Sequence, residues 1–442
     1  MTFSIQFDSC FDSCWMLLPQ FRCHAPLHDT VQSKIAEVAS QPEEGTVSAE
    51  KGLESNMNSS PVPGWMSKIV VYLGFAGTGV GMALPGSVLP ALLKQWSMSD
   101  AQAGFFFFLG WMGTSVGALL VGSSRVRSLA LGSFLVAIGA LGMAFGSRWP
   151  GFTSMAVYGV GLGMTMTAVS LLQARRNALR RGLELNRLNL VWALGACVCP
   201  SLAAHSLRVA SVRAIFSAVC VFFALFCLWT LAFERDPVHS TQEDIAASSA
   251  AGRRWTLALW PLAIVCVIFL PTGIEASMGA WIAAYVQRTQ QTISTTVTAG
   301  SCFWIGLMLS RTLSSFILTL RHTERIVLAQ SLATVVVGTL LLIASTASLG
   351  ILPGVFLIGF GLGPVYPLLL AIALQYSERT PIFFVAGLGS AFLPWLTGIV
   401  SSSTSSLRLG LLVPVFASVL MLGLGLRVAA MPGKVARDLL PG

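Results

Sequence analysis

Long uninterrupted apolar stretches dominate this chain from about residue 66 to about residue 430. Each is long enough, at roughly 20 residues, to cross the hydrocarbon of a bilayer as a helix. None alternates between polar and apolar residues, which argues against the strands of a membrane barrel. The pattern predicts twelve spans, at 69–93, 103–122, 128–146, 152–173, 187–206, 214–233, 257–286, 294–317, 325–345, 347–374, 382–401 and 408–430.

The apolar pattern also repeats. The segment GVGLG at 159–163 returns as GFGLG at 359–363, and Trp111, followed by a glycine two residues later, is matched in the same way by Trp304. Likewise, the pair Leu194-Gly195, followed by Pro200, returns as Leu388-Gly389, followed by Pro394. A duplicated block of hydrophobic helices is typical of secondary transporters built from two halves. We therefore predict an all-α membrane protein with twelve transmembrane helices in two six-helix pseudo-repeats.

Three segments depart from this pattern. The first 65 residues are polar, acidic and rich in Ser, Glu, Gln and Asn, which is typical of disorder, and Met66 is an alternative start directly before the first span. A polar segment separates the halves, and a short tail follows the last span. The predicted organisation is a leader at 1–65, an N-terminal half at 66–233, a cytoplasmic linker at 234–256, a C-terminal half at 257–430 and a tail at 431–442.

Composition and charge sharpen the membrane assignment. Hydrophobic residues make up 55% of the chain and charged residues 10%, whereas a soluble domain carries about 25% charged residues. The net charge of +9 conceals a split, because residues 1–66 hold eight acidic and three basic residues and the rest of the chain holds 10 acidic and 24 basic ones. The basic excess beyond residue 66 is distributed over short loops, which does not indicate a nucleic-acid surface. Thirteen basic residues of the loops fall on the side of the termini and six on the other side. The positive-inside rule therefore places both termini in the cytoplasm, and we expect a bacterial inner (plasma) membrane protein.

Several short motifs resemble enzyme signatures but lack the required context. The sequence GTSVG at 113–117 fits the nucleophile pattern, yet it lies inside an apolar helix rather than at a strand-to-helix turn. The glycine triplets lack the strands that flank nucleotide-binding loops, and no P-loop or metal-ligand cluster occurs. We predict no enzyme activity, no cofactor, no metal and no nucleic-acid partner. The expected partners are a small-molecule solute, H⁺ or Na⁺ as a candidate coupling ion, and membrane lipid around a monomer.

Glu275 is the only carboxylate well inside a predicted span. It lies ten residues before Tyr285, which corresponds to about 15 Å of helix and puts it near mid-membrane. An ionised carboxylate facing lipid costs at least about 2.5 kcal/mol, so Glu275 should face a cavity or a partner. We predict that it binds the solute or couples transport to a cation. The alternative is a structural carboxylate bonded to neighbouring helices.

Arginine and tryptophan supply the other candidates. Arg311, toward the cytoplasmic end of the eighth span, is either a gate or an anion ligand, or a brace that bonds carbonyls or a carboxylate at the helix ends. The structural role is the favoured interpretation. Trp192, Trp281 and Trp304 share spans with the polar candidates, and Trp395 lies in the eleventh span. Their flat faces suit the apolar C–H faces of sugars, but tryptophan also serves helix packing and interfacial belts.

Four segments of the apolar spans, at 185–195, 273–285, 303–311 and 361–367, resemble the major facilitator superfamily. Within that superfamily they are most similar to the L-fucose permease branch with its sodium-dependent glucose transporter-like members. The sequence GIEASMGAWIAAY at 273–285 is similar to the family's G-x-E-x-x-x-G-G-W-x-x-x-Y seventh helix, with Ala280 in place of a glycine. The segments 303–311, 361–367 and 185–195 are similar to its eighth, tenth and fifth helices. The resemblance implies the major facilitator fold and a solute site between the two halves.

The resemblance also implies a set of binding residues. By the match to the family's fifth helix, Asn189 occupies a polar position one turn from Trp192. Together with Glu275, Trp304 and Tyr366, these two residues are expected to bind the solute.

The chain departs from the family at two places. Its loop at 122–127 lacks the family's usual Asp, and its first and fourth spans lack the carboxylates that serve proton coupling in the permease. Any cation coupling would therefore depend on Glu275, with uniport as the other possibility. We predict a secondary active transporter for a small polar organic solute, preferably a sugar, that works by alternating access with or without H⁺ or Na⁺ symport. The alternatives are an efflux carrier for drugs or other hydrophobic compounds, and a non-transporting membrane sensor on the same fold.

Overall fold

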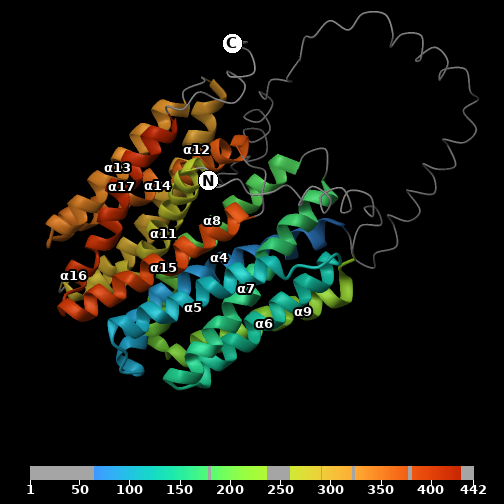
Figure 1. The fold of residues 1–442 in the computed structure, drawn as a ribbon. Coiled ribbons are helices and arrows are strands. Elements are labelled where there is room, and N and C mark those ends of the chain that lie inside the picture. Colours follow the sequence, from blue (N-terminus) through green and yellow to red (C-terminus); the bar gives the residue numbers. More distant parts are fainter. Residues whose placement is uncertain are drawn as a thin grey trace, which may run out of the picture. The chain divides into compact units, whose positions relative to one another are not determined.

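The described part of the chain is almost entirely helical (Figure 1). The computed structural model describes residues 64–177, 181–235, 259–289, 291–320, 324–376 and 381–429. The predicted leader (up to residue 63), linker (from residue 236) and tail lie outside these residues. Within the described ranges there are twelve long helices, one short helix and no strand.

The long helices fall into two groups of six along the chain. The first group comprises α4 (Gly64–Gln95), α5 (Asp100–Leu119), α6 (Arg125–Phe145), α7 (Arg148–Arg176), α8 (Arg181–Val209) and α9 (Val212–Phe233). The second group comprises α11 (Leu259–Arg288), α12 (Ile293–Leu320), α13 (Glu324–Ala344), α14 (Ser348–Tyr376), α15 (Pro381–Thr404) and α17 (Leu412–Ala429), with the four-residue α16 (Leu407–Gly410) directly before α17.

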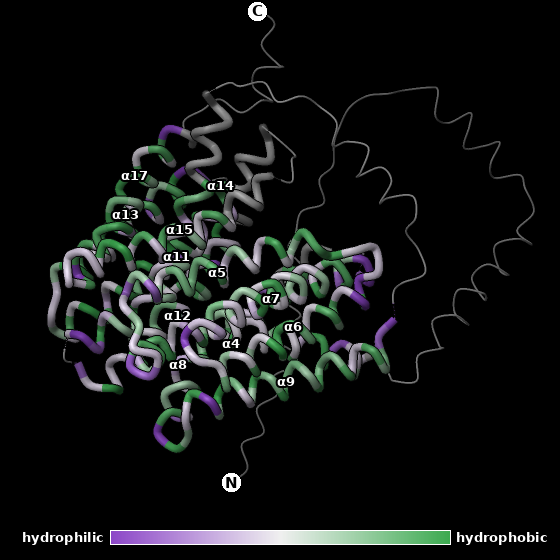
Figure 2. Tube along the Cα trace, turned by 60° about the horizontal axis from the view of Figure 1, so that its bottom comes forward, coloured by the Kyte–Doolittle hydropathy of each residue, from purple (hydrophilic) through white to green (hydrophobic). Residues whose placement is uncertain are grey.

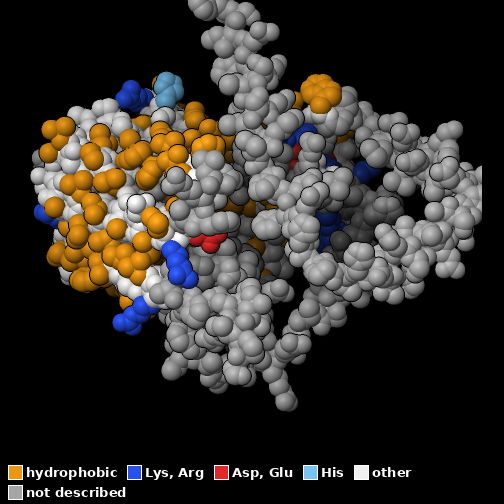
Figure 3. Space-filling model, turned by 90° about the horizontal axis from the view of Figure 1, so that it is seen from above, with side chains coloured by type: hydrophobic (Ala, Val, Ile, Leu, Met, Phe, Trp, Pro, Cys, Tyr) orange, Lys and Arg blue, Asp and Glu red, His pale blue; other side chains and the backbone are white. Residues whose placement is uncertain are grey.

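The helices present apolar side chains to their surroundings, as a membrane requires. Among the described residues, nine helices are long and apolar enough to cross a bilayer. On α9, Leu225, Leu228 and Leu231 recur every three residues and are each more than 60% exposed. Hydrophobic residues, coloured green, predominate along the helices in Figure 2. Hydrophobic side chains cover much of the described surface in Figure 3. The prediction of an all-α membrane protein is therefore confirmed.

The helix ends carry the polar groups that lipid would not tolerate. Ser99 caps α5 in a capping box with Gln102, and Ser124 and Ser211 cap α6 and α9. Each serine side chain accepts a bond from a backbone N–H of the first turn, which would otherwise lack a partner. The starts of these three helices therefore lie at a capping serine.

The repeated glycine triplets mark the same helix crossing in each half. A Cβ atom on Gly163 of α7 would overlap the carbonyl oxygen of Thr114 on α5. In the second half, a Cβ atom on Gly363 of α14 would lie 2.8 Å from the carbonyl oxygen of Leu307 on α12. Small residues are what allow two membrane helices to approach this closely.

The repeated Leu-Gly pair behaves in the same way. Gly195 of α8 lies against the backbone of Ala76 on α4, and Gly389 of α15 lies against the backbone of Phe269 on α11. The same pairs of helices thus cross at equivalent glycines in both halves. The sequence repeat is the trace of two six-helix pseudo-repeats with common internal packing.

The two groups of helices meet along two main contacts. Helix α5 packs along α15, and α4 packs against α11. Gly104 of α5 approaches the backbone of Trp395, and Gly398 of α15 approaches the backbone of Asp100. For reference below, the Asp100 end is the end of the bundle where α4 ends and α5 begins, and the Ser67 end is the opposite end, where α4 begins.

Candidate functional site

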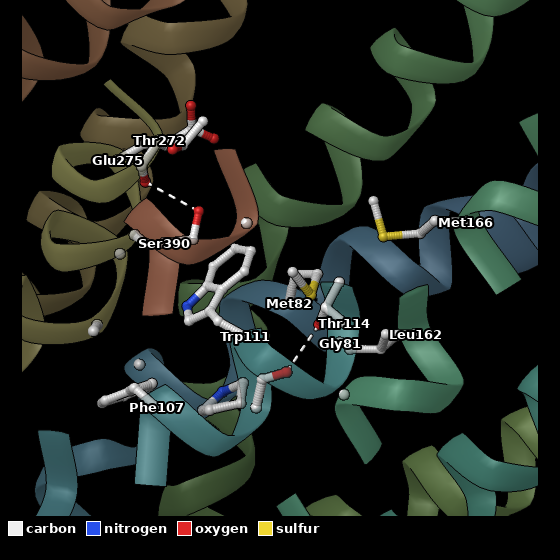
Figure 4. Close-up of a pocket in the computed structure, with 18 of the residues that line it drawn as sticks. Gly81, Met82, Phe107, Trp111, Thr114, Leu162, Met166, Thr272, Glu275 and Ser390 are labelled. Atoms are coloured by element: carbon white, nitrogen blue, oxygen red, sulfur yellow. Dashed lines mark hydrogen bonds between the residues drawn. The ribbon is translucent and has the colours of Figure 1, made fainter. Parts of the chain in front are cut away.

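A cavity of about 350 Å³ lies between the two groups of helices. It is lined from α4, α5, α7 and α8 on one side and from α11, α12, α14 and α15 on the other. Ligand cavities in proteins usually span about 300–1,000 Å³, so this one suits a small solute. We call it the central cavity, and Figure 4 shows part of its lining.

An ion pair stands on the wall formed by the second group of helices. The Nη2 atom of Arg311 on α12 lies 3.3 Å from Oε2 of Glu275 on α11. The Nε atom of Arg311 also donates to the carbonyl oxygen of Gly363 on α14, at 3.2 Å. Glu275 and Arg311 are the only charged side chains among the described residues that line the cavity. They remain 20% and 30% exposed, so the pair is accessible to a solute.

Uncharged polar groups surround this pair on the same wall. Tyr366 of α14, Thr272 of α11 and Ser390 of α15 all line the cavity. The Ser390 hydroxyl donates to the carbonyl oxygen of Thr272, at 3.3 Å. Figure 4 shows Thr272, Glu275 and Ser390 gathered on one side of the cavity. This wall offers hydrogen-bond donors, acceptors and a balanced pair of charges.

The opposite wall, formed by the first group of helices, is mainly apolar. Figure 4 shows Met82, Leu162 and Met166 on the side away from Glu275, and Trp111 between the two sides. The hydroxyl groups of this wall donate to the backbone. Tyr158 donates to the Gly81 carbonyl at 3.0 Å, Thr114 to Gly110 at 3.0 Å and Ser115 to Trp111 at 3.1 Å. The central cavity is therefore amphipathic, with one charged and polar wall and one apolar wall.

Most of the residues selected from the sequence come together here. Trp192, Glu275, Trp304, Arg311 and Tyr366 all line the central cavity. The rings of Trp192 and Trp304 meet edge to face, with centroids 5.7 Å apart and planes at 81°.

Asn189 lies elsewhere. It is exposed on α8 and is not among the residues that line the central cavity, although Trp192 one turn later is.

Sequence reasoning missed several residues of the lining. Thr272 and Ser390 lie in long apolar segments and carried no distinctive pattern. Trp111 did carry a signal, because the repeat pairs it with Trp304, and both line the cavity. The recurrence of this tryptophan in both halves is therefore a sequence signal for a cavity position.

A second ion pair joins the two groups of helices at the Asp100 end. Arg288 of α11 donates from Nη1 and Nη2 to the two carboxylate oxygens of Asp100 on α5, both at 2.6 Å. Ser401 of α15 also donates to Asp100. Burial raises the pKa of Asp100, but the hydrogen bonds from Arg288 and Ser401 lower it by more, so this pKa lies below its usual value.

The described ion pairs at the Ser67 end connect helices of the first group to one another. Arg176 of α7 contacts Glu234, which follows α9, at 2.6 Å, and Ser67 of α4 donates to the same carboxylate. Lys68 of α4 and Arg187 of α8 both contact Glu184, at 3.1 and 2.9 Å. These contacts stabilise the first half itself.

Comparison with solved structures shows the fold. The chain is similar to a bacterial homologue of the human lysosomal transporter Spinster in an inward-facing, occupied conformation, with a TM-score of 0.66, 11% identity and coverage of 86% of this chain and 100% of that chain. A D-xylose–proton symporter gives a TM-score of 0.62 at 12% identity, with coverage of 80% and 96%. The nucleoside transporter NupG gives 0.62 at 14% identity, with coverage of 85% and 98%.

Comparison by sequence shows the family. No curated protein matches this sequence significantly. The family model described as Major Facilitator Superfamily matches residues 71–382, well over half of the chain. The two six-helix pseudo-repeats and the cavity between them agree with that match. This chain belongs to the Major Facilitator Superfamily of membrane transporters.

Proposed function

We propose that this protein is a secondary active transporter for a small polar organic solute, most readily a sugar, which binds in the central cavity and crosses by alternating access. The observation that carries the proposal is the amphipathic cavity. The Glu275–Arg311 pair with Tyr366 offers hydrogen bonds to hydroxyl groups, and the facing wall offers Trp111 and methionine surface to an apolar face. A sugar ring presents both kinds of surface.

The proposed binding set is Trp192, Glu275, Trp304 and Tyr366, with Arg311 holding the carboxylate in place. Asn189 is kept as a more distant candidate, on the strength of its match to the family's fifth helix. The resemblance of the seventh, eighth and tenth helices to the L-fucose permease branch supports a sugar. The D-xylose–proton symporter and NupG, which are similar in fold, make pentoses, hexoses and nucleosides the first solutes to examine.

Glu275 is the proposed coupling residue. A carboxylate that takes up H⁺ or Na⁺ loses its attraction for Arg311, so cation binding and the arrangement of the polar wall are linked. The negative charge of Glu275 is balanced by Arg311, which suits an uncharged solute.

The Asp100 end is proposed to face the outside. The basic bias of the loops supports a cytoplasmic location for the termini and the 234–256 linker, with the Ser67 end inside. On this assignment the Asp100–Arg288 pair closes the outer side. We also propose that residues 66–233 and 257–430 move as the two halves.

The test is uptake of radiolabelled pentoses, hexoses and nucleosides into proteoliposomes, with H⁺ gradients, Na⁺ gradients or neither. We expect saturable uptake of at least one of these solutes, above that of protein-free liposomes, and weaker uptake by Glu275→Ala. Equal uptake by wild-type proteoliposomes and protein-free liposomes, for every solute and gradient, would contradict the proposal.

A second candidate function is efflux of hydrophobic compounds. It is favoured by one observation, the predominance of apolar side chains such as Met82, Phe107, Met155, Leu162 and Met166 in the cavity. Dye export from cells that express the protein tests it. Export that persists in Glu275→Ala would favour this candidate over the sugar transporter.

A further inference from the structure

A second cavity, of about 290 Å³, lies beside the central one. It is lined from α4, α8, α11 and α12 and includes Lys94 and Arg208, in the last turns of α4 and α8, so it lies toward the Asp100 end. Gly86, Gly279 and Trp304 line both cavities. The two cavities are therefore neighbours along the interface of the two halves, and we call the second one the outer cavity.

The partition between the cavities is thin. A Cβ atom on Gly86 would overlap the carbonyl oxygen of Gly279, so the backbones of α4 and α11 touch at this point. Beside this crossing, the Trp304 indole lies 3.3 Å from where a Cβ atom of Gly279 would be. The ring of Trp304 also meets the ring of Trp192 across the halves. The partition consists of one backbone crossing and one aromatic contact.

The outer cavity is bounded by a contact between α8 and α12. Pro200 lies 3.0 Å from where a Cβ atom of Gly300 would be, and both residues line the cavity. The hydroxyl groups of the next residues, Ser201 and Ser301, are 3.4 Å apart. The helices thus touch along one side of the cavity.

The polar lining of the outer cavity is neutral or basic. Hydroxyl and carboxamide groups come from Ser87, Gln287, Gln291 and Thr296, and no described lining residue carries a carboxylate. Gln291 is held by its side-chain bond to the carbonyl oxygen of Thr346, at 2.9 Å. Carboxamides and hydroxyls both donate and accept, so they suit a polyhydroxyl solute without requiring it to carry a charge.

We propose that the outer cavity is a second binding position for the transported solute, an uncharged polyhydroxyl compound, in series with the central cavity. Trp304 is the gate between the two positions. The solute docks among Gln287, Gln291 and Thr296, and it enters the central cavity when the contact between Trp192 and Trp304 opens. This inference rests on the proposed transport function for the identity of the solute, whereas the gate can be tested without any solute.

The first experiment tests the gate by cysteine accessibility. Thr114 lines the central cavity only, and Thr114→Cys, in a background without other accessible cysteines, reports access from the Asp100 end. A membrane-impermeant thiol reagent is applied to that side of sealed vesicles. We expect Trp304→Ala to speed labelling of Thr114→Cys at least tenfold. Trp149→Ala is the matched control, because Trp149 is 62% exposed on α7 and lines neither cavity, and it should change the rate less than twofold.

Equal labelling rates in the Trp304→Ala and Trp149→Ala backgrounds would overturn the gate. This outcome does not depend on which solute is transported, so a failure of the gate is distinct from a failure of the proposed function.

The second experiment tests whether the outer cavity lies on the route. Ala204 of α8 lines the outer cavity, whereas Leu202 on the same helix is 51% exposed and is not among the lining residues. Ala204→Cys and Leu202→Cys fold before they are modified, so a bulky thiol reagent adds volume without disturbing folding. We expect modification of Ala204→Cys to reduce uptake at least tenfold and modification of Leu202→Cys to reduce it less than twofold. Full uptake by modified Ala204→Cys would show that the solute bypasses the outer cavity.

Discussion

The two walls of the central cavity differ although both come from the same six-helix repeat. The wall from α11, α12, α14 and α15 carries Glu275, Arg311, Tyr366, Thr272 and Ser390. The wall from α4, α5, α7 and α8 carries methionine, leucine and aromatic side chains, and its hydroxyl groups donate to the backbone. The repeat has kept the helix crossings while the chemistry of the two walls has diverged.

The contrast between the walls separates the residues that set helix packing from those that can recognise a solute. Helix crossings depend on glycines, which recur at equivalent places and give both halves the same packing. Recognition depends on side chains that face the cavity, which the packing leaves free to vary. We therefore expect polar specificity and coupling to depend on the second half, and shape and apolar affinity to depend on the first.

The largest effect is expected from breaking the polar wall at Arg311. Arg311→Gln leaves the Glu275 carboxylate without its cation, and a hydrogen bond to a charged group is worth about 2 kcal/mol. We expect solute affinity, measured by scintillation proximity, to fall about 30-fold, since each 1.4 kcal/mol is about tenfold.

The double variant Glu275→Gln, Arg311→Gln is the control for this loss. It removes both charges, so thermal stability in detergent should return toward wild type while affinity stays low. An affinity of Arg311→Gln within twofold of wild type would place recognition elsewhere.

A smaller effect is expected from the apolar wall. Trp111→Ala removes part of the flat surface that faces the solute, worth about 1.4 kcal/mol if roughly 55 Å² of apolar contact is lost. Affinity should fall about tenfold, while the dependence of uptake on an ion gradient is retained. Trp111→Phe keeps an aromatic face and should stay within threefold of wild type. A loss of ion dependence in Trp111→Ala would refute the division of roles between the walls.

The contact at the Asp100 end should have a moderate effect. Asp100→Asn removes the charge that Arg288 holds, and a partly exposed pair contributes about 1 kcal/mol. Labelling of Thr114→Cys from that end should therefore become about fivefold faster. Unchanged labelling would mean that packing of α5 on α15 closes this end without the ion pair.

The same contact predicts the response to pH. The pKa of Asp100 lies below its usual value of 3.8. The Asp100–Arg288 pair therefore contributes to closing this end at any pH above 3.8, and the contribution is lost only as pH falls through the lowered pKa. The labelling rate of Thr114→Cys from the Asp100 end, corrected for thiolate content, should be constant between about pH 5 and pH 8. A steep rise within that window would assign the closure to a different titrating group.

The smallest effect is expected at Asn189. It is exposed and does not line the central cavity, so Asn189→Ala should change affinity less than twofold. A larger loss would show that Asn189 meets the solute in another conformation of the transport cycle.

Much of the fold follows from local properties of the sequence. The lengths of the apolar stretches predict the transmembrane helices. The repeated glycines predict where helices cross, because only glycine fits where Gly163 meets Thr114 or Gly389 meets Phe269. Glu275 was also predictable as a cavity residue, since a lone carboxylate at mid-membrane needs a polar surrounding.

Pairings between helices were not predictable, because they depend on how each helix is rotated about its axis. Arg311 was placed near a membrane surface by sequence, yet it reaches Glu275 in the central cavity. Trp281 and Trp304 look alike in sequence. Trp281 is fully buried and donates to the carbonyl oxygen of Pro394 at 3.0 Å, whereas Trp304 lines both cavities. A helical pattern alone does not separate these two environments.

The most direct test of the account compares exchange with accumulation in proteoliposomes containing wild type or Glu275→Gln. Glutamine keeps the shape and a carbonyl acceptor but cannot titrate. If the polar wall couples transport through Glu275, the variant should exchange solute at equal concentrations at a rate near wild type and fail to accumulate solute when an H⁺ or Na⁺ gradient is imposed. Gradient-driven accumulation by Glu275→Gln at the wild-type level would contradict the account and leave Glu275 as a binding or structural residue.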